Sequence, residues 1–131
     1  MAGFSNSVEN SLLNHFFGKS TYTAPTIFVG LSTADPGEAG ATDTPPVGGS
    51  YARVETAAAS WNTSTAGQTT NATAIAFPGA TAAWGDVTYY TFYSAASAGT
   101  FLGAGPLSTA YTIGNGSAVQ FAAGQLIFNL D

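Results

Sequence analysis

The stretch from Thr81 to Ser94 constrains the fold of this chain more than any other. It holds five aromatic residues within ten positions: Trp84, Tyr89, Tyr90, Phe92 and Tyr93. After Gly85-Asp86 the side chains alternate, and β-branched and aromatic residues in period two are typical of a buried strand. Both faces of this strand carry bulky residues. We therefore predict a central strand that is covered on each side.

The chain carries very little charge, and this excludes several classes of partner. Only 7% of its 131 residues are charged, with two basic residues and a formal net charge of -5. Nucleic-acid binding needs lysines and arginines to neutralise phosphates, and so does adhesion to anionic membranes. No apolar stretch approaches the roughly 18 residues that span a bilayer. We expect neither a nucleic-acid nor a membrane partner.

An α-helix is predicted for Ser5 to Phe17. Its apolar residues recur with helical spacing and form one stripe: Val8, Leu12, Leu13, Phe16 and Phe17. Glu9 follows Asn6 by three positions, which resembles a capping box, and Gly18 supplies a stop. Residues 1–18 are thus interpreted as a helical arm. The arm either packs on the sheet of its own domain or docks on a neighbouring subunit.

The rest of the chain is typical of short strands separated by turns. The expected strands are Thr26–Thr33, Tyr51–Glu55, Thr69–Phe77, Thr100–Leu107 and Gln125–Leu130, with a hairpin of Tyr111–Ile113 and Ser117–Phe121 around Asn115-Gly116. The pattern predicts one mainly β domain over residues 1–131. Its expected form is an antiparallel β-sandwich or jelly-roll-like module with one N-terminal α-helix.

One long segment, residues 34–50, is rich in glycine, proline and acidic residues. It opens with a strong turn signal at Asp35-Pro36-Gly37 and has no apolar pattern of its own. Loops of this length in compact domains tend to be functional or mobile. We therefore place the candidate interface on this loop and on the helix, at Val8, Leu12, Phe16, Asp35, Pro36, Glu38, Asp43, Pro45 and Pro46.

The sequence contains few residues that could act in catalysis or bind a metal. His15 is the only histidine, and no serine or cysteine nucleophile motif accompanies it. Asp35, Glu38 and Asp43 could form a hydrolytic pair or bind calcium, but they share one loop and lack the calcium-loop spacing. There are no cysteines for thiolate metal sites. We predict no catalytic residue, no metal, no cofactor and no enzymatic activity.

Six short motifs, taken in order, resemble a family of small phage virion proteins that are often labelled tail fibre or minor tail proteins. The motifs are S-V-E-N-S-L-L-N-H-F-F-G (7–18), T-A-D-P-G (33–37), G-G-S-Y-A-R (48–53), N-A-T-A-I-A-F-P (71–78), A-A-W-G-D-V-T (82–88) and F-A-A-G-Q-L-I-F-N-L-D (121–131). They are spread from Ser7 to Asp131, so the resemblance extends over nearly the whole chain.

The resemblance implies a structural protein of a tailed-phage virion, and we favour a capsid decoration (cement) protein. A small β body with reaching arms suits a protein that clamps neighbouring capsid subunits, since weak contacts strengthen when many copies act on one lattice. The expected partners are capsid or tail structural subunits. We also expect a symmetric homo-oligomer, with a trimer preferred.

Other functions remain open at this point. The protein could be a tail fibre or baseplate component, or a receptor-binding β module that stacks sugars on exposed tyrosines. The candidate tyrosines for stacking are Tyr89, Tyr90, Tyr93 and Tyr111. A small hydrolase is the third class. Copy number separates a decoration protein from a tail protein, because the first is present in hundreds of copies per particle and the second in a handful.

Overall fold

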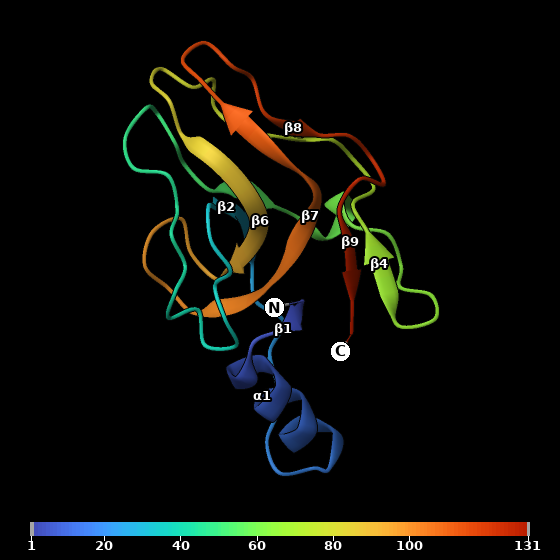
Figure 1. Cartoon of the computed structure of the whole chain (residues 1–131). Helices are drawn as coiled ribbons and strands as arrows, with labels where there is room; N and C mark the ends of the chain where they lie inside the picture. The colour runs from blue at the N-terminus through green and yellow to red at the C-terminus, as the bar shows by residue number, and fades with distance from the viewer. Residues whose placement is uncertain (1, 131) are drawn as a thin grey trace.

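A five-stranded antiparallel sheet forms the body of the protein in the computed structural model, which describes residues 2–130 (Figure 1). The strand order is β1-β7-β6-β2-β3. The strands are β1 (Gly3–Phe4), β2 (Ile27–Ser32), β3 (Val54–Thr56), β6 (Gly85–Tyr93) and β7 (Phe101–Ile113). The aromatic stretch therefore forms the middle strand of this sheet, between β7 and β2, and its predicted central position is confirmed.

Two small antiparallel sheets form a second layer. One pairs β4 (Gln68–Thr70) with β9 (Ile127–Asn129), and the other pairs β5 (Ile75–Ala76) with β8 (Gln120–Phe121). Their apolar side chains join those of the large sheet in one core, as in the contact of Phe128 with Phe92 at 5.0 Å between ring centroids. A short 3-10 helix, η1 (Ala58–Ser60), lies between β3 and β4. The predicted mainly β fold with antiparallel strands is confirmed.

Residues 34–50 cover the opposite face of the large sheet. The hydroxyl of Tyr93 donates a hydrogen bond to Asp43 Oδ2 at 2.6 Å, and that of Tyr89 donates to Asp35 Oδ2 at 3.2 Å. Gly40 lies so close to the Phe101 ring that a Cβ there would sit 2.6 Å from Cγ. The segment expected to reach toward neighbours is thus folded back over its own sheet.

Two predicted strand features differ from the structure. The stretch Thr69–Phe77 is divided into β4 and β5, which belong to different sheets. The predicted hairpin around Asn115-Gly116 contains a turn but no strand pairing, because β8 leaves β7 and pairs with β5. In both cases an apolar side chain enters the second layer of the core, and Phe121, which is 2% exposed, is the largest of them.

The helix α1 (Asn6–Phe16) is confirmed as the single α-helix of the described residues. Its N-cap is Ser5, whose Oγ accepts from the backbone N–H of Val8 and donates to the carbonyl of Phe101 at 2.9 Å. Since the N3 position is therefore Val8, Glu9 cannot complete the predicted capping box. The helix ends before Gly18, which has φ of +73° as a left-handed stop requires.

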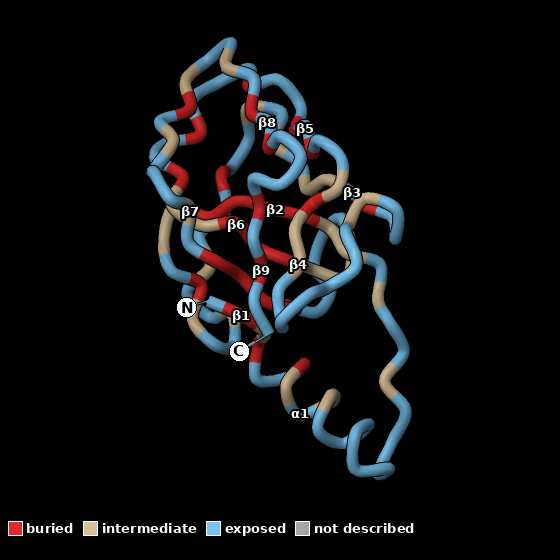
Figure 2. Tube along the Cα trace, turned by 90° about the vertical axis from the view of Figure 1, so that its right-hand side faces the viewer, coloured by how far each residue is buried: buried red, intermediate tan, exposed pale blue. Residues whose placement is uncertain are grey.

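The helix projects from the β body and packs against the core only as far as Leu12. Residues 3–4 add the edge strand β1 to the large sheet, and Val8 is the one buried residue of the helix. Figure 2 shows the change from buried to exposed residues along α1. The predicted arm of residues 1–18 therefore has two parts, a base that belongs to the core and an end that points away from it.

A buried phenol in the central strand makes stability dependent on alkaline pH. Burial raises the pKa of Tyr90 to about 12, and its hydroxyl donates to the carbonyl of Ile127 at 2.7 Å. Because the folded pKa lies above the unfolded value near 10, the stabilisation is complete below pH 10 and is lost as the pH rises toward 12. We expect the free energy of unfolding to fall by about 2–3 kcal/mol in this window.

Urea denaturation at pH 9 and at pH 12 measures this effect, and Tyr90→Phe is the matched variant. The phenylalanine variant should lose less stability over the same pH range than the native chain, since it has no phenol to ionise at this position. An equal loss in both proteins would show that Tyr90 ionises as freely in the folded state as in the unfolded one.

Candidate interaction surface

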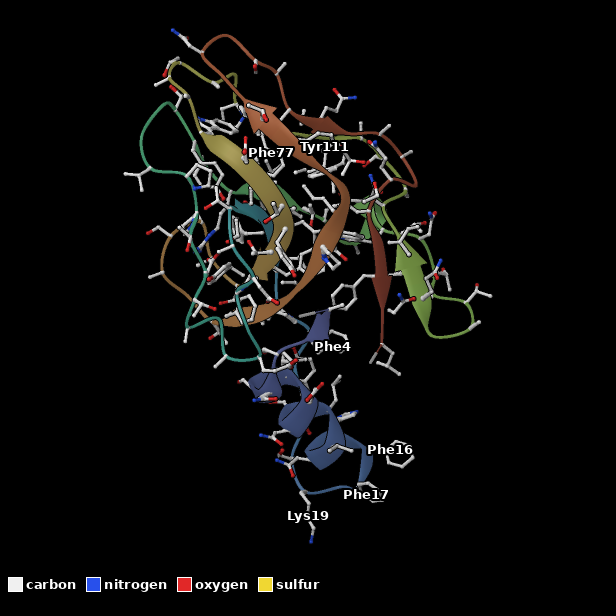
Figure 3. All side chains as sticks on the ribbon, viewed as in Figure 1. Phe4, Phe16, Phe17, Lys19, Phe77 and Tyr111 are labelled. Carbon is white, nitrogen blue, oxygen red and sulfur yellow. The ribbon has the colours of Figure 1, made fainter. Side chains whose placement is uncertain are left out.

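Three large apolar side chains are exposed at the free end of α1. The exposed fractions are 57% for Leu13, 79% for Phe16 and 68% for Phe17. The two phenylalanine rings contact each other edge to face, with centroids 5.0 Å apart. Figure 3 shows both phenylalanines at the end of the helix, far from the β body. We call these three residues the apolar tip, and exposed apolar clusters of this kind mark interaction sites.

An apolar pocket of about 250 Å³ lies at the other end of the helix. Its walls come from β1, α1, the segment that returns from the helix to β2, and the second layer. The main lining side chains are Phe4, Val8, Tyr22, Ile27, Trp61 and Phe128. We call this space the base pocket. It is built where the projecting helix leaves the body, because the helix packs against the core there only as far as Leu12.

One stripe of α1 connects the base pocket with the apolar tip. Val8, Leu12 and Phe16 are spaced by four residues and therefore lie on one side of the helix. Val8 is buried and lines the base pocket, Leu12 is half-buried, and Phe16 is exposed. The interpretation that the helix packs on its own domain therefore holds for its base, and docking on a neighbouring subunit stays a prediction for its tip. Its base packs on its own domain, and its tip has no cover from the described chain.

The return segment after α1 holds the helix in place and carries the basic charge of this end. The backbone N–H of Tyr22 donates to His15 Nδ1 at 3.2 Å, which ties the segment to the exposed side of the helix. Lys19, the only lysine of the chain, lies beside the apolar tip (Figure 3). The other basic residue, Arg53, is engaged elsewhere and donates to the carbonyls of Ala95 and Ala98.

The candidate residues of the 34–50 segment occupy different environments. Pro36 and Pro46 are buried within the chain, whereas Glu38 and Pro45 are exposed. The carbonyl of Glu38 accepts from the N–H of Asn6, so this part of the segment contacts the start of α1. Asp35 and Asp43 are the carboxylates that bind the two tyrosines of β6 described above. The stretch is therefore held to its own sheet at several points, although ten of its 17 residues, Asp35 among them, are exposed.

Residues 2–130 contain no cluster of metal-ligating side chains and no tyrosine or tryptophan in the exposed class. No group of three or more histidine, aspartate or glutamate side chains comes together there to hold a metal. Each of the described tyrosine and tryptophan side chains is buried or half-buried. No described helix has both the length and the apolar character to cross a membrane.

The interface residues expected from the sequence did not include Leu13 or Phe17. The base pocket was not expected from the sequence either. The two side chains follow the same helical pattern as Phe16, and their exposure becomes evident only when the helix is seen to leave the body. The pocket combines residues from distant parts of the chain, so no local pattern signals it.

The chain matches one known protein family over almost its whole length. The model of the family Gp80, described as podophage GP4 fiber I protein gp80, matches residues 3–129. The matched range runs from the first residue of β1 to the last residue of β9, and so includes both layers and the helix. No curated protein matches the chain.

Proposed function

Because the chain belongs to the podophage GP4 fiber I protein gp80 family, it is a structural component of a phage virion, and we propose that it forms part of the tail fibre. The observation that carries the proposal is the apolar tip of α1. This surface sits at the end of an element that projects from a rigid β body. It suits assembly into a larger structure through protein contacts.

The energetic argument concerns the three residues of the apolar tip. Burying one large apolar side chain fully contributes about 1.5–3 kcal/mol. Phe16 and Phe17 are each exposed by more than two thirds, so most of this contribution is still available to an assembly contact. Such a contact would hold the protein in the particle without any charged surface. This agrees with a chain in which only 7% of the residues are charged.

The 34–50 segment supports a fibre component over a capsid decoration protein. A decoration protein needs arms that reach across to neighbouring lattice subunits, and this segment was expected to be a reaching element together with the helix. Its aspartates bind Tyr89 and Tyr93 of its own sheet, and Pro36 and Pro46 are buried. The projecting helix is then the one long element available for contacts, which suits attachment at one end.

The proposed role is structural, with no catalysis. Membership of a phage structural family suggests a protein without enzymatic activity. The exposed His15 uses Nδ1 to accept from the backbone of Tyr22, and no nucleophile motif accompanies it. Receptor binding through stacked sugars finds no support in the tyrosines of β6, which are buried or half-buried.

Copy number per particle tests the fibre proposal. We expect quantitative mass spectrometry of purified virions to give a handful of copies, with the major capsid protein of the same particles as the internal standard. Hundreds of copies, in a fixed ratio to the capsid protein, would instead identify a capsid decoration protein and overturn the proposal.

A further inference from the structure

We propose that the apolar tip docks on a second copy of this chain, in the base pocket of that copy. Two α1 helices then lie antiparallel about a two-fold axis, and each tip fills the pocket of the other copy. This inference rests on the proposed assembly role of the tip and names its partner. It predicts a dimer that is built from a single self-complementary surface.

The first argument is that one stripe carries both halves of the contact. Val8 at the base pocket and Phe16 at the apolar tip are eight residues apart, which is about 12 Å along a helix. When two such helices pair in opposite directions, the end of each faces the beginning of the other. A two-fold axis then satisfies both tips and both pockets together, as an isologous interface requires.

The second argument is orientation. The base pocket lies between α1 and the second layer, since Val8 of α1, Thr69 of β4 and Phe128 of β9 line it. Figure 3 shows the ring of Phe16 directed toward the same side of the molecule as β4 and β9. In this view the tip therefore lies on the side of α1 on which strands β4 and β9 of the pocket wall also lie. A second copy can approach from that side without crossing the β body.

The third argument is size and chemistry. A pocket of about 250 Å³ is below the range of roughly 300–1,000 Å³ that is typical of small-molecule sites. The aromatic rings of Phe4, Trp61 and Phe128 line it and can receive a phenylalanine edge to face. The pocket is therefore suited to one or two side chains of the kind that the apolar tip presents.

The fourth argument is charge. Glu9 lies in the first turn of α1, whereas Lys19 follows its last turn. An antiparallel pair brings Glu9 of one copy toward Lys19 of the second copy, and the two helix dipoles also oppose each other favourably. A parallel pair would place like charges together. The antiparallel pair also keeps the two bodies, which share the net charge of -5 per chain, at opposite ends.

The paired helices form a small contact, and this sets the expected affinity. Each α1 has 11 residues and a length of about 16 Å. Such a contact falls at the low end of protein interfaces, below about 1,200 Å². We therefore expect a dimer that dissociates on dilution in solution. In a fibre, where other contacts hold the copies together, the same interface is strengthened by effective concentration.

Sedimentation velocity of the full chain over a concentration series tests the dimer. The native protein should shift from monomer to dimer as its concentration rises. Phe16→Ser should raise the dissociation constant at least tenfold, while its circular dichroism and melting temperature stay native because Phe16 is exposed. The matched control is Val47→Ser, which removes an exposed apolar side chain (93% exposed) outside α1 and the base pocket and should leave dimerisation unchanged.

A second pair of variants tests the pocket and the symmetry. Ala24 is exposed and lines the base pocket, so Ala24→Trp should fill the pocket without removing a core side chain. At a concentration where the native chain is dimeric, Ala24→Trp and Phe16→Ser should each be mostly monomeric alone. When they are mixed, the intact tip of the first fits the intact pocket of the second, so the heterodimer keeps one of the two contacts and should form more tightly than either homodimer. A mixture that associates no more tightly than the separate variants would overturn the tip-in-pocket arrangement.

The remaining outcomes are equally decisive. A native protein that stays monomeric at every concentration, or that forms a trimer, overturns the two-fold pair. A dimer that is unaffected by Phe16→Ser overturns the role of the tip. None of these results changes the copy number in the virion, and a capsid-like copy number leaves the dimer standing, so failures of the two proposals are distinguishable.

Discussion

Trp84→Ala should lower the free energy of unfolding by about 3–5 kcal/mol, as removal of a buried large aromatic does. Trp84 directly precedes β6 and is only 4% exposed. Its Nε1 donates to the carbonyl of Gly49 at 2.9 Å, and its ring contacts Tyr51 edge to face at 5.3 Å. The substitution leaves a cavity beneath the end of the 34–50 segment and removes the hydrogen bond that holds it.

The loss should extend to the edge of the large sheet. The hydroxyl of Tyr51 accepts from the backbone N–H of Leu31 in β2, at a point beyond the end of β3. Urea denaturation followed by circular dichroism measures the effect, because the tryptophan fluorescence itself is altered. Trp84→Phe is the matched control and should cost clearly less, since it keeps most of the ring. A midpoint unchanged in Trp84→Ala would show that this side chain is exposed.

Asn71→Ala should destabilise the protein by at least about 3 kcal/mol, although it removes few atoms. Asn71 is 0% exposed. Its amide nitrogen donates to the carbonyls of Thr73 and Ala122, both at 2.9 Å, and its amide oxygen accepts from the N–H of Leu126 at 2.9 Å. Each buried partner that is left unsatisfied costs about 1–3 kcal/mol. The side chain thus holds the second layer together at the corner between β4 and β5.

Thermal and urea denaturation of Asn71→Ala measure this effect beside Asn62→Ala. Asn62 is a nearby exposed asparagine whose amide makes one side-chain hydrogen bond, to Thr70 Oγ1. We expect less than about 1 kcal/mol for this control. Equal costs in the two variants would mean that the hydrogen bonds of Asn71 contribute no more than those of an exposed asparagine.

The elements with strong local patterns could be predicted from the sequence. The apolar spacing and Gly18 were enough to locate α1, and the aromatic alternation was enough to place β6 in the centre. In β6, however, the alternation does not account for Val87. Val87 belongs to the same buried cluster as Tyr90 and Phe92. The pairing of β6 with β7 shifts in register between Val87 and Tyr89 and again between Phe92 and Tyr93. The extra residues lie in β7, so the period of two in β6 gives no sign of them.

The second layer could not be predicted because its strands are two or three residues long. At that length the pairing partner is chosen by tertiary contacts, and local propensity has little influence. Asn71 illustrates this. In the sequence it reads as one polar position within a continuous strand, but in the structure its amide satisfies backbone groups more than 50 residues away.

The candidate surface was predicted in part. The helical stripe of Val8, Leu12 and Phe16 was visible as a pattern, and its division into a buried base and an exposed end was not. That division depends on β1, where two residues attach to Gly103 and Ala104 of β7 and so fix the direction in which α1 leaves the body. Sequence spacing cannot report such an angle.

The position of the protein in averaged electron-microscope images of the virion tests the fibre proposal most directly. A small tag inserted beside Val47 marks the chain without touching α1, because this side chain is 93% exposed at the surface of the 34–50 segment. We predict that the added density lies on the fibres of the tail. Added density spread over the capsid lattice would contradict the proposal.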